Sequence, residues 1–201
     1  MDAVVPFVGL TGGLGAGKST ALAALHRLGA AVLSTDAVVH ELYAGEQLRD
    51  AVVERWGPEV APDGVVDRSA VAERAFSAEA DREWIEGLLW PLVGARVAEW
   101  LAEVRAGRES PTRPRAAVVE TPLLFEAGME GLYDATIAVI SGERLRERRA
   151  AARGHALPDE RAARQLPQQE KARRATFVVR NDGTEEALER ELSAVLDKLV
   201  A

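Results

Sequence analysis

Short apolar runs alternate with longer segments of helical periodicity along this chain. The runs are bounded by turn residues and have the length of buried strands; five occur, at 3–10, 30–33, 116–119, 136–140 and 176–179. Between them, apolar residues recur every three or four positions, as they do on one face of a helix. Strands that alternate with helices predict an α/β fold, with a five-stranded parallel sheet core and helices on both of its faces.

Two long helical blocks interrupt this alternation. About eighty residues of mostly helical pattern separate the second strand from the third, and a second block lies between the fourth and the fifth. Within the first block, Ser77 is expected to cap the N-terminus of a helix. We therefore expect three parts: a core made of 1–36, 116–141 and 175–201, a helical insertion at 37–115, and a helical lid at 142–174.

The composition is that of a globular protein, because 47% of the 201 residues are hydrophobic and can form a sizeable core. There is no cysteine, which excludes disulfides and thiolate chemistry, and the three histidines are not spaced as metal ligands. No apolar stretch is as long as a membrane span, and the first run is too short for a secretion signal. We expect a cytoplasmic monomer with no membrane partner.

The formal net charge of −7 argues against a broad basic surface, so we expect no nucleic-acid partner. The charge is unevenly distributed, however. Residues 144–174 carry ten cations and four acids, a formal charge of +6, which leaves −13 for the rest of the chain. This basic segment is either a solvated helix surface or a site for a small anion.

The first strand leads directly into a glycine-rich loop. Residues 12–19 read G-G-L-G-A-G-K-S and match the pattern G-x-x-x-x-G-K-S/T at the start of a helix. In such a loop the backbone N–H groups and the helix N-terminus bind phosphates, Lys18 reaches the β- and γ-phosphates, and the Ser19 hydroxyl ligates Mg²⁺. The alternative is a strand–helix turn with a chance lysine. The complete match favours a nucleoside triphosphate site, without naming the reaction.

Two carboxylates follow strands whose carboxyl ends lie at the same sheet edge as this loop, where ligands gather. Asp36 can orient or deprotonate an acceptor hydroxyl or hold Mg²⁺ through water; the alternative is a helix N-cap. Glu120 can support the metal or the acceptor, or it is simply solvated. His40, one helical turn after Asp36, can face the same cleft, or it is a partly buried structural histidine.

Arginines in the basic block have the spacing of one helical face. Arg149 and Arg153 are four residues apart, and Arg146 lies three residues before Arg149. Phosphoryl transfer spreads negative charge over oxygens that the planar guanidinium group neutralises. Any one of these arginines can be a solvated helix residue, but as a group they favour a role in binding phosphates.

The chain resembles the dephospho-CoA kinase family, which is similar in fold to nucleoside monophosphate kinases, over nearly its whole length. The phosphate loop is shared by many families, whereas Pro-Leu-Leu-Phe-Glu at 122–126 and Gln-Leu-Pro-x-x-Glu-Lys at 165–171 are more specific. The other matching elements are Asp36, Asp63-Gly64 with Arg68, the pair Arg149 and Arg153, and Asn181-x-Gly183.

This resemblance implies ATP-dependent phosphorylation of the ribose 3′-hydroxyl of dephospho-CoA to CoA, the last step of CoA biosynthesis, with Mg²⁺ on Ser19. It also implies a P-loop kinase fold whose helical insertion binds the acceptor. The implied catalytic residues are Asp36, as the base, with Lys18, Arg149 and Arg153. The implied ATP-binding residues are Gly13, Leu14, Gly15, Ala16, Gly17, Lys18, Ser19, Thr20, Asn181 and Gly183. The implied acceptor-binding residues are His40, Arg68, Glu120, Pro122, Leu123 and Leu124.

The chain also departs from the family pattern. Ser34 replaces the first carboxylate of an Asp-Ala-Asp element, Trp90 a histidine before proline, Arg146 a lid glutamine, and Thr176 an aspartate. These changes spare the phosphate loop and Asp36 and concern acceptor contacts; we expect Trp90 to pack in the core. Two other functions use the same loop: a nucleoside or nucleotide kinase, and a nucleotide-binding switch protein. A switch that reads guanine would carry Asn-Lys-x-Asp, which does not occur here.

Overall fold

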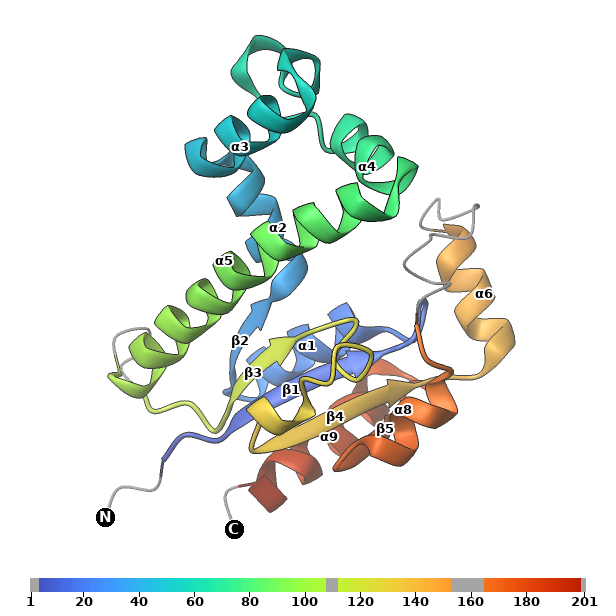
Figure 1. The fold of residues 1–201 in the computed structure, drawn as a ribbon. Coiled ribbons are helices and arrows are strands. Elements are labelled where there is room, and N and C mark those ends of the chain that lie inside the picture. The colour runs from blue at the N-terminus through green and yellow to red at the C-terminus, as the bar shows by residue number, and fades with distance from the viewer. Residues whose placement is uncertain (1–3, 108–111, 153–164, 200–201) are drawn as a thin grey trace. The chain divides into compact units, whose positions relative to one another are not determined.

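The computed structural model in Figure 1 describes residues 4–107, 112–152 and 165–199. Its contacts divide the chain into two compact units, one made of Met1–Ser34 and Leu101–Ala201 and the other of Thr35–Trp100. In the first unit the strands form one parallel sheet in the order β2-β3-β1-β4-β5. The strands are β1 (Phe7–Gly12), β2 (Ala31–Ser34), β3 (Ala117–Glu120), β4 (Ala135–Ile140) and β5 (Phe177–Arg180).

All five expected strands are confirmed: the first is shifted from the expected 3–10 to Phe7–Gly12, and the bounds of the others agree to within one residue. β1 begins at Phe7 because Pro6 lacks an N–H; only its carbonyl takes part in pairing, as acceptor from the Ala117 N–H. At its other end β1 continues to Gly12, because Thr11 and Gly12 still pair with Ala138 and Val139 of the neighbouring β4. The phosphate loop therefore starts at the carboxyl edge of the central strand.

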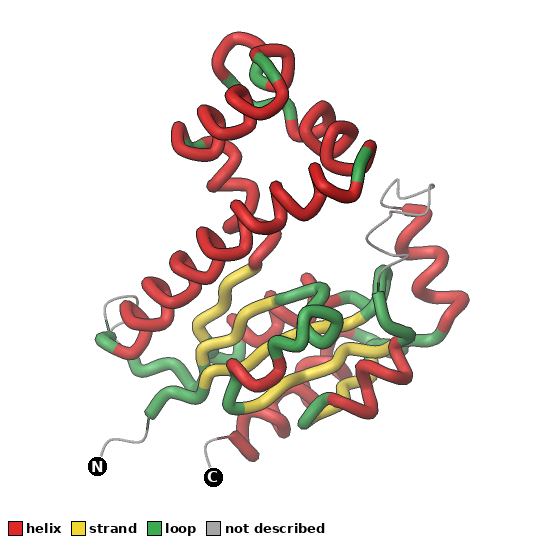
Figure 2. Tube along the Cα trace, viewed as in Figure 1, coloured by secondary structure: helices red, strands yellow, loops and turns green. Residues whose placement is uncertain are grey.

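Helices cover both faces of the sheet (Figures 1 and 2). Val8 and Leu10 of β1 pack in one core with α1 (Lys18–Arg27) and α9 (Glu185–Leu199), which contact each other. Side chains alternate between faces along a strand, so Thr11 lies on the opposite face, where it contacts α8 (Gln168–Arg174). The α6 helix (Glu143–Ala152) follows β4.

The second unit, Thr35–Trp100, is helical throughout. Its elements are α2 (Thr35–Ala44), α3 (Glu46–Trp56), two short 3₁₀ helices (Pro58–Val60 and Pro62–Gly64), α4 (Arg68–Ser77) and most of α5 (Glu79–Arg105). Leu48, Val52, Val71 and Ile85 lie in its core, and the Trp56 and Trp84 rings meet edge to face beside it. This unit thus has an apolar core separate from that of the sheet.

Two sequence-based expectations for this unit are wrong. Ser77 ends α4, and its hydroxyl donates to the Arg74 carbonyl inside that helix; it does not cap α5. Trp90 is 56% exposed and does not pack in the core. On α5, Ile85 faces the core. Trp90 follows five residues later, and at 100° per residue its side chain is rotated by about 140° from that of Ile85, away from the core. Within the described ranges, every helix is too short or too polar to cross a bilayer.

Candidate functional site

The loop between β1 and α1 has the conformation that phosphate binding requires. Gly15 and Gly17 have φ angles of +73° and +92°, which an L side chain rarely adopts. Gly17 precedes the first turn of α1, so the N–H groups of that turn, which have no acceptor within an α-helix, and the positive end of the helix dipole lie at the loop. The Nζ of Lys18 lies 3.5 Å from the Gly13 carbonyl oxygen, which holds the ammonium group over the loop. The following Ser19 is exposed.

Glycine is also needed because other elements lie against this loop. A Cβ at Gly15 would overlap the backbone carbonyl of Arg146 in α6, and a Cβ at Gly17 would overlap the side-chain amide of Asn181. The loop is therefore held between the start of α6 and the segment after β5.

Asn181, implied by the resemblance as an ATP-binding residue, is buried and bonded to the protein. Its side-chain Nδ2 donates to the Ala16 carbonyl at 2.9 Å, and its backbone carbonyl accepts from Arg149 NH1 at 3.1 Å. The Arg149 guanidinium lies beside Gly17, since NH1 is 3.6 Å from the position of a Cβ there. Asn181 thus joins the loop to Arg149 of α6, while Gly183 nearby is exposed. Arg153 lies outside the described residues.

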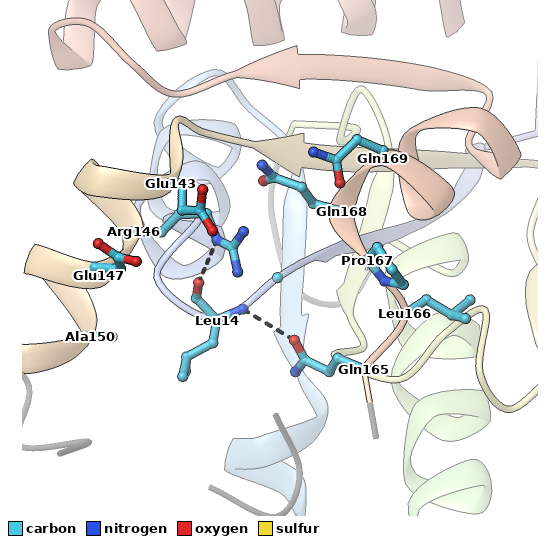
Figure 3. A pocket seen from close by; sticks show the side chains of 11 residues that line it. Leu14, Glu143, Arg146, Glu147, Ala150, Gln165, Leu166, Pro167, Gln168 and Gln169 are labelled. Carbon is cyan, nitrogen blue, oxygen red and sulfur yellow. Dashed lines mark hydrogen bonds between the residues drawn. The ribbon is translucent and has the colours of Figure 1, made fainter. Parts of the chain in front are cut away.

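The peptide of Leu14 is held from both sides (Figure 3). Arg146 Nε donates to the Leu14 carbonyl at 3.0 Å, and the Leu14 N–H donates to Gln165 Oε1 at 3.1 Å. Beside it is a cavity of about 470 Å³; its described lining residues are Gly13, Leu14, Glu143, Arg146, Glu147, Ala150, Gln165, Leu166, Pro167, Gln168 and Gln169. Sequence reasoning did not assign Gln165 a role, although it opens the Gln-Leu-Pro motif.

A fully buried lysine, Lys171, contacts the end of β1 just before the phosphate loop. Lys171 Nζ donates to the Pro122 carbonyl at 2.6 Å and to Thr11 Oγ1 at 3.4 Å, and it pairs with Glu126 Oε1 at 3.0 Å. Glu126 Oε1 also accepts the backbone N–H of Leu166 at 2.7 Å. Burial of the ammonium group lowers the pKa of Lys171, the pairing with Glu126 opposes this shift, and the charge of Lys18 adds to it. Lys171 therefore joins α8, β1 and the segment after β3.

The residues after β3 have mixed environments. Glu120 is 6% exposed and accepts from Ser34 Oγ at 3.3 Å, so the alternative of a solvated carboxylate is wrong. Leu124, implied as an acceptor-binding residue, is buried against Gly9, whereas Pro122 and Leu123 are half-buried. The Leu124 side chain is in the core, where it fills the space beside Gly9, which has no Cβ.

The helical unit brings together two of the implied acceptor-binding residues. Arg68 NH1 lies 2.7 Å from His40 Nδ1, and its guanidinium lies 5.7 Å from the centre of the Tyr43 ring. Arginine can only donate, so Nδ1 of His40 accepts and the ring proton is on Nε2. His40 is exposed, which contradicts the alternative of a partly buried histidine. Asp36 is exposed in the first turn of α2 and follows Ser34, the last residue of β2, by two positions.

Metal binding at this site would depend on the nucleotide. Among the described residues, no three His, Asp or Glu side chains gather as a metal site. The exposed hydroxyl of Ser19 at the start of α1 does fit Mg²⁺ held by one protein oxygen, phosphate oxygens and waters. When bound there, the ion would offset phosphate charge.

A parallel sheet whose central strand feeds a G-x-x-x-x-G-K-S loop, with Arg146 and Arg149 of α6 beside that loop, defines a P-loop kinase. The model of the dephospho-CoA kinase family matches residues 6–187. A dephospho-CoA kinase from Anaeromyxobacter dehalogenans is 38% identical over 199 residues, 96% of this chain and 91% of that protein. One from Deinococcus radiodurans is also 38% identical, with 96% and 91% covered. The chain belongs to the dephospho-CoA kinase family.

Solved structures agree with this assignment. A crystal structure from Thermus thermophilus has a TM-score of 0.80 and 36% identity, and the match covers 99% of this chain and 100% of that one. The dephospho-CoA kinase from Campylobacter jejuni has a TM-score of 0.65 with 98% of both chains covered. Its identity of 20% supports the shared fold alone.

Proposed function

We propose that this enzyme transfers the γ-phosphoryl group of ATP to the ribose 3′-hydroxyl of dephospho-CoA, giving CoA and ADP. The observation that carries the proposal is the contact between the two family-specific motifs. Pro122 and Glu126 of the first motif meet Leu166 and Lys171 of the second in one cluster, and Lys171 also contacts Thr11, the residue before the phosphate loop. Family membership and an intact phosphate loop supply the ATP-dependent kinase chemistry.

The donor site uses groups that are already in place. Loop N–H groups and Lys18 bind the β- and γ-phosphates, and Arg149 beside Gly17 adds positive charge to the triphosphate site. Little covalent chemistry is asked of the protein, so rate comes from positioning and electrostatics. The Ser19 hydroxyl is the proposed protein ligand of Mg²⁺.

Asp36 is the proposed base. As the 3′-oxygen forms its bond to the γ-phosphorus, the bond from that phosphorus to the β–γ bridging oxygen breaks, and ADP leaves with the electron pair. The hydroxyl proton passes to the Asp36 carboxylate, which the structure leaves exposed in the first turn of α2. Arg68 and the Nε2–H of His40 are the proposed contacts to the anionic acceptor.

An ADP-release assay with a panel of acceptors tests both points. We expect turnover with dephospho-CoA and little with nucleosides or nucleoside monophosphates; preference for a monophosphate would refute the acceptor, and binding of guanine over adenine nucleotides would favour a switch protein. Asp36→Asn should lower kcat by about a hundredfold or more with ATP affinity unchanged. Glu46→Gln, which removes an exposed carboxylate from the first turn of α3, is the matched control. An active Asp36→Asn enzyme would disprove the assignment of Asp36 as the base.

A further inference from the structure

We propose that Arg146 contacts the γ-phosphoryl group of ATP and is a catalytic residue in addition to Lys18 and Arg149. This inference rests on the proposed function for the identity of the donor. It assigns the two arginines of α6 to opposite ends of the phosphate loop.

The first support is the position of the guanidinium group. Its NH2, Cζ and Nε lie 3.4, 3.5 and 3.6 Å from the position of a Cβ on Gly13, so the group covers the first part of the loop. The bond from Nε to the Leu14 carbonyl fixes this position. Figure 3 shows the guanidinium beside Leu14 at the cavity that the loop, α6 and the start of α8 share.

The second support is the direction of the nucleotide along the loop. Arg149 lies at Gly17 and is bonded to Asn181, in the segment that the resemblance places near adenine. With the adenine ring at this end, the triphosphate runs from Gly17 toward Gly13, and its γ-phosphate lies at the Gly13 end. Arg146 precedes Arg149 by three residues on the same helical face and is the guanidinium at that end.

The third support is charge. Arginines such as Arg27, Arg55 and Arg174 pair with carboxylates. In the part of the chain that the structure describes, Arg146 has no carboxylate within ion-pair distance, and the Leu14 carbonyl is the hydrogen-bond acceptor of its side chain. Its two terminal nitrogens can therefore donate to an anion in the planar fork that suits phosphate. Glu143 and Glu147 line the same cavity, so a phosphate entering it needs this cation to offset them.

Nucleotide affinity measured by calorimetry separates this role from the acceptor chemistry. Arg146→Gln keeps a side-chain donor for Leu14 but removes the charge. We expect it to weaken binding of a non-hydrolysable ATP analogue by about tenfold or more, and binding of ADP by less than about threefold, because only the analogue has a γ-phosphate. Arg146→Lys should recover part of the loss, and in turnover kcat should fall more than KM for ATP rises.

Arg144→Gln removes an equal charge from an exposed position of α6 and is the matched control, expected to bind both nucleotides as the wild type does. Equal losses for ADP and the analogue in Arg146→Gln would overturn the proposal, as would the same loss in Arg144→Gln or wild-type binding of the analogue. A wild-type enzyme that binds ATP but does not phosphorylate dephospho-CoA would refute the proposed acceptor and leave the Arg146 contact standing.

Discussion

Lys171 shows how a single buried charge can organise this site. The side chain has no exposed surface and is surrounded by the Pro122 carbonyl, the Thr11 hydroxyl and the Glu126 carboxylate. A buried ammonium group is tolerated only when oxygen partners replace its hydration. Those partners come from β1 and the segment after β3. One buried charge on α8 therefore holds these three elements together next to the phosphate loop.

Replacing Lys171 by methionine should therefore lower the free energy of unfolding by about 3 kcal/mol, because it leaves a buried carboxylate without its partner. Urea unfolding measures this loss. The double variant Lys171→Met with Glu126→Gln, which removes both charges, should recover part of it. If the single variant were as stable as the wild type, the ion pair would not contribute to folding.

The same residue gives the protein a pH dependence with a definite sign. Burial holds the pKa of Lys171 below its ordinary value, so between the two values the unfolded chain binds more protons than the folded one. Stability from this group is therefore gained as pH rises through that window and lost as pH falls through the folded-state pKa. As the pH rises toward about 10.4, the ordinary pKa of lysine, the wild type should gain stability relative to Lys171→Met; a relative loss would contradict the direction.

The packing of helix α6 on the phosphate loop explains why the loop needs glycine before any nucleotide binds. At Gly15 both the positive φ and the Arg146 carbonyl exclude a side chain. At Gly13 the nearest atoms belong to the movable end of the Arg146 side chain, and φ is not positive. The two glycines of one loop are thus required to different degrees.

Gly15→Ala should consequently lower the free energy of unfolding of the nucleotide-free enzyme by about 1–3 kcal/mol, through backbone strain and displacement of α6. Gly13→Ala, the control in the same loop, should cost clearly less. Thermal and urea unfolding of both variants decide the point. A larger loss for Gly13→Ala would show that α6 does not pack on the loop as described.

Elements that depend on local pattern were predictable from the sequence, and those that depend on distant partners were not. The strands and the phosphate loop follow from apolar runs and from one contiguous motif. Trp90 was misplaced because its exposure depends on which face of α5 the other helices cover, which short-range periodicity does not specify. The contact of Gln165 with Leu14 joins residues 151 positions apart, and only folding reveals it.

The charge distribution of the chain agrees with a division of labour between parts. A protein with a net charge of −7 must bind two anionic substrates, and the +6 segment at 144–174 supplies the needed cations. Two of them, Arg146 and Arg149, lie at opposite ends of the phosphate loop. The helical unit contributes Arg68 and His40, which we propose as acceptor contacts. The expected domains, a core, an acceptor-binding insertion and a lid, thus remain a proposal that ligand binding can test.

Hydrogen exchange of the whole enzyme, followed by mass spectrometry, provides that test. A non-hydrolysable ATP analogue should slow exchange in peptides covering the phosphate loop and α6, because it bonds the loop amides and the arginines beside them. Dephospho-CoA should in addition slow exchange in α2 and α4, which carry His40 and Arg68. AMP, which lacks the pantetheine arm, is the control and should protect α2 and α4 less. Protection by dephospho-CoA restricted to 1–34 and 101–201 would mean that Thr35–Trp100 does not bind the acceptor.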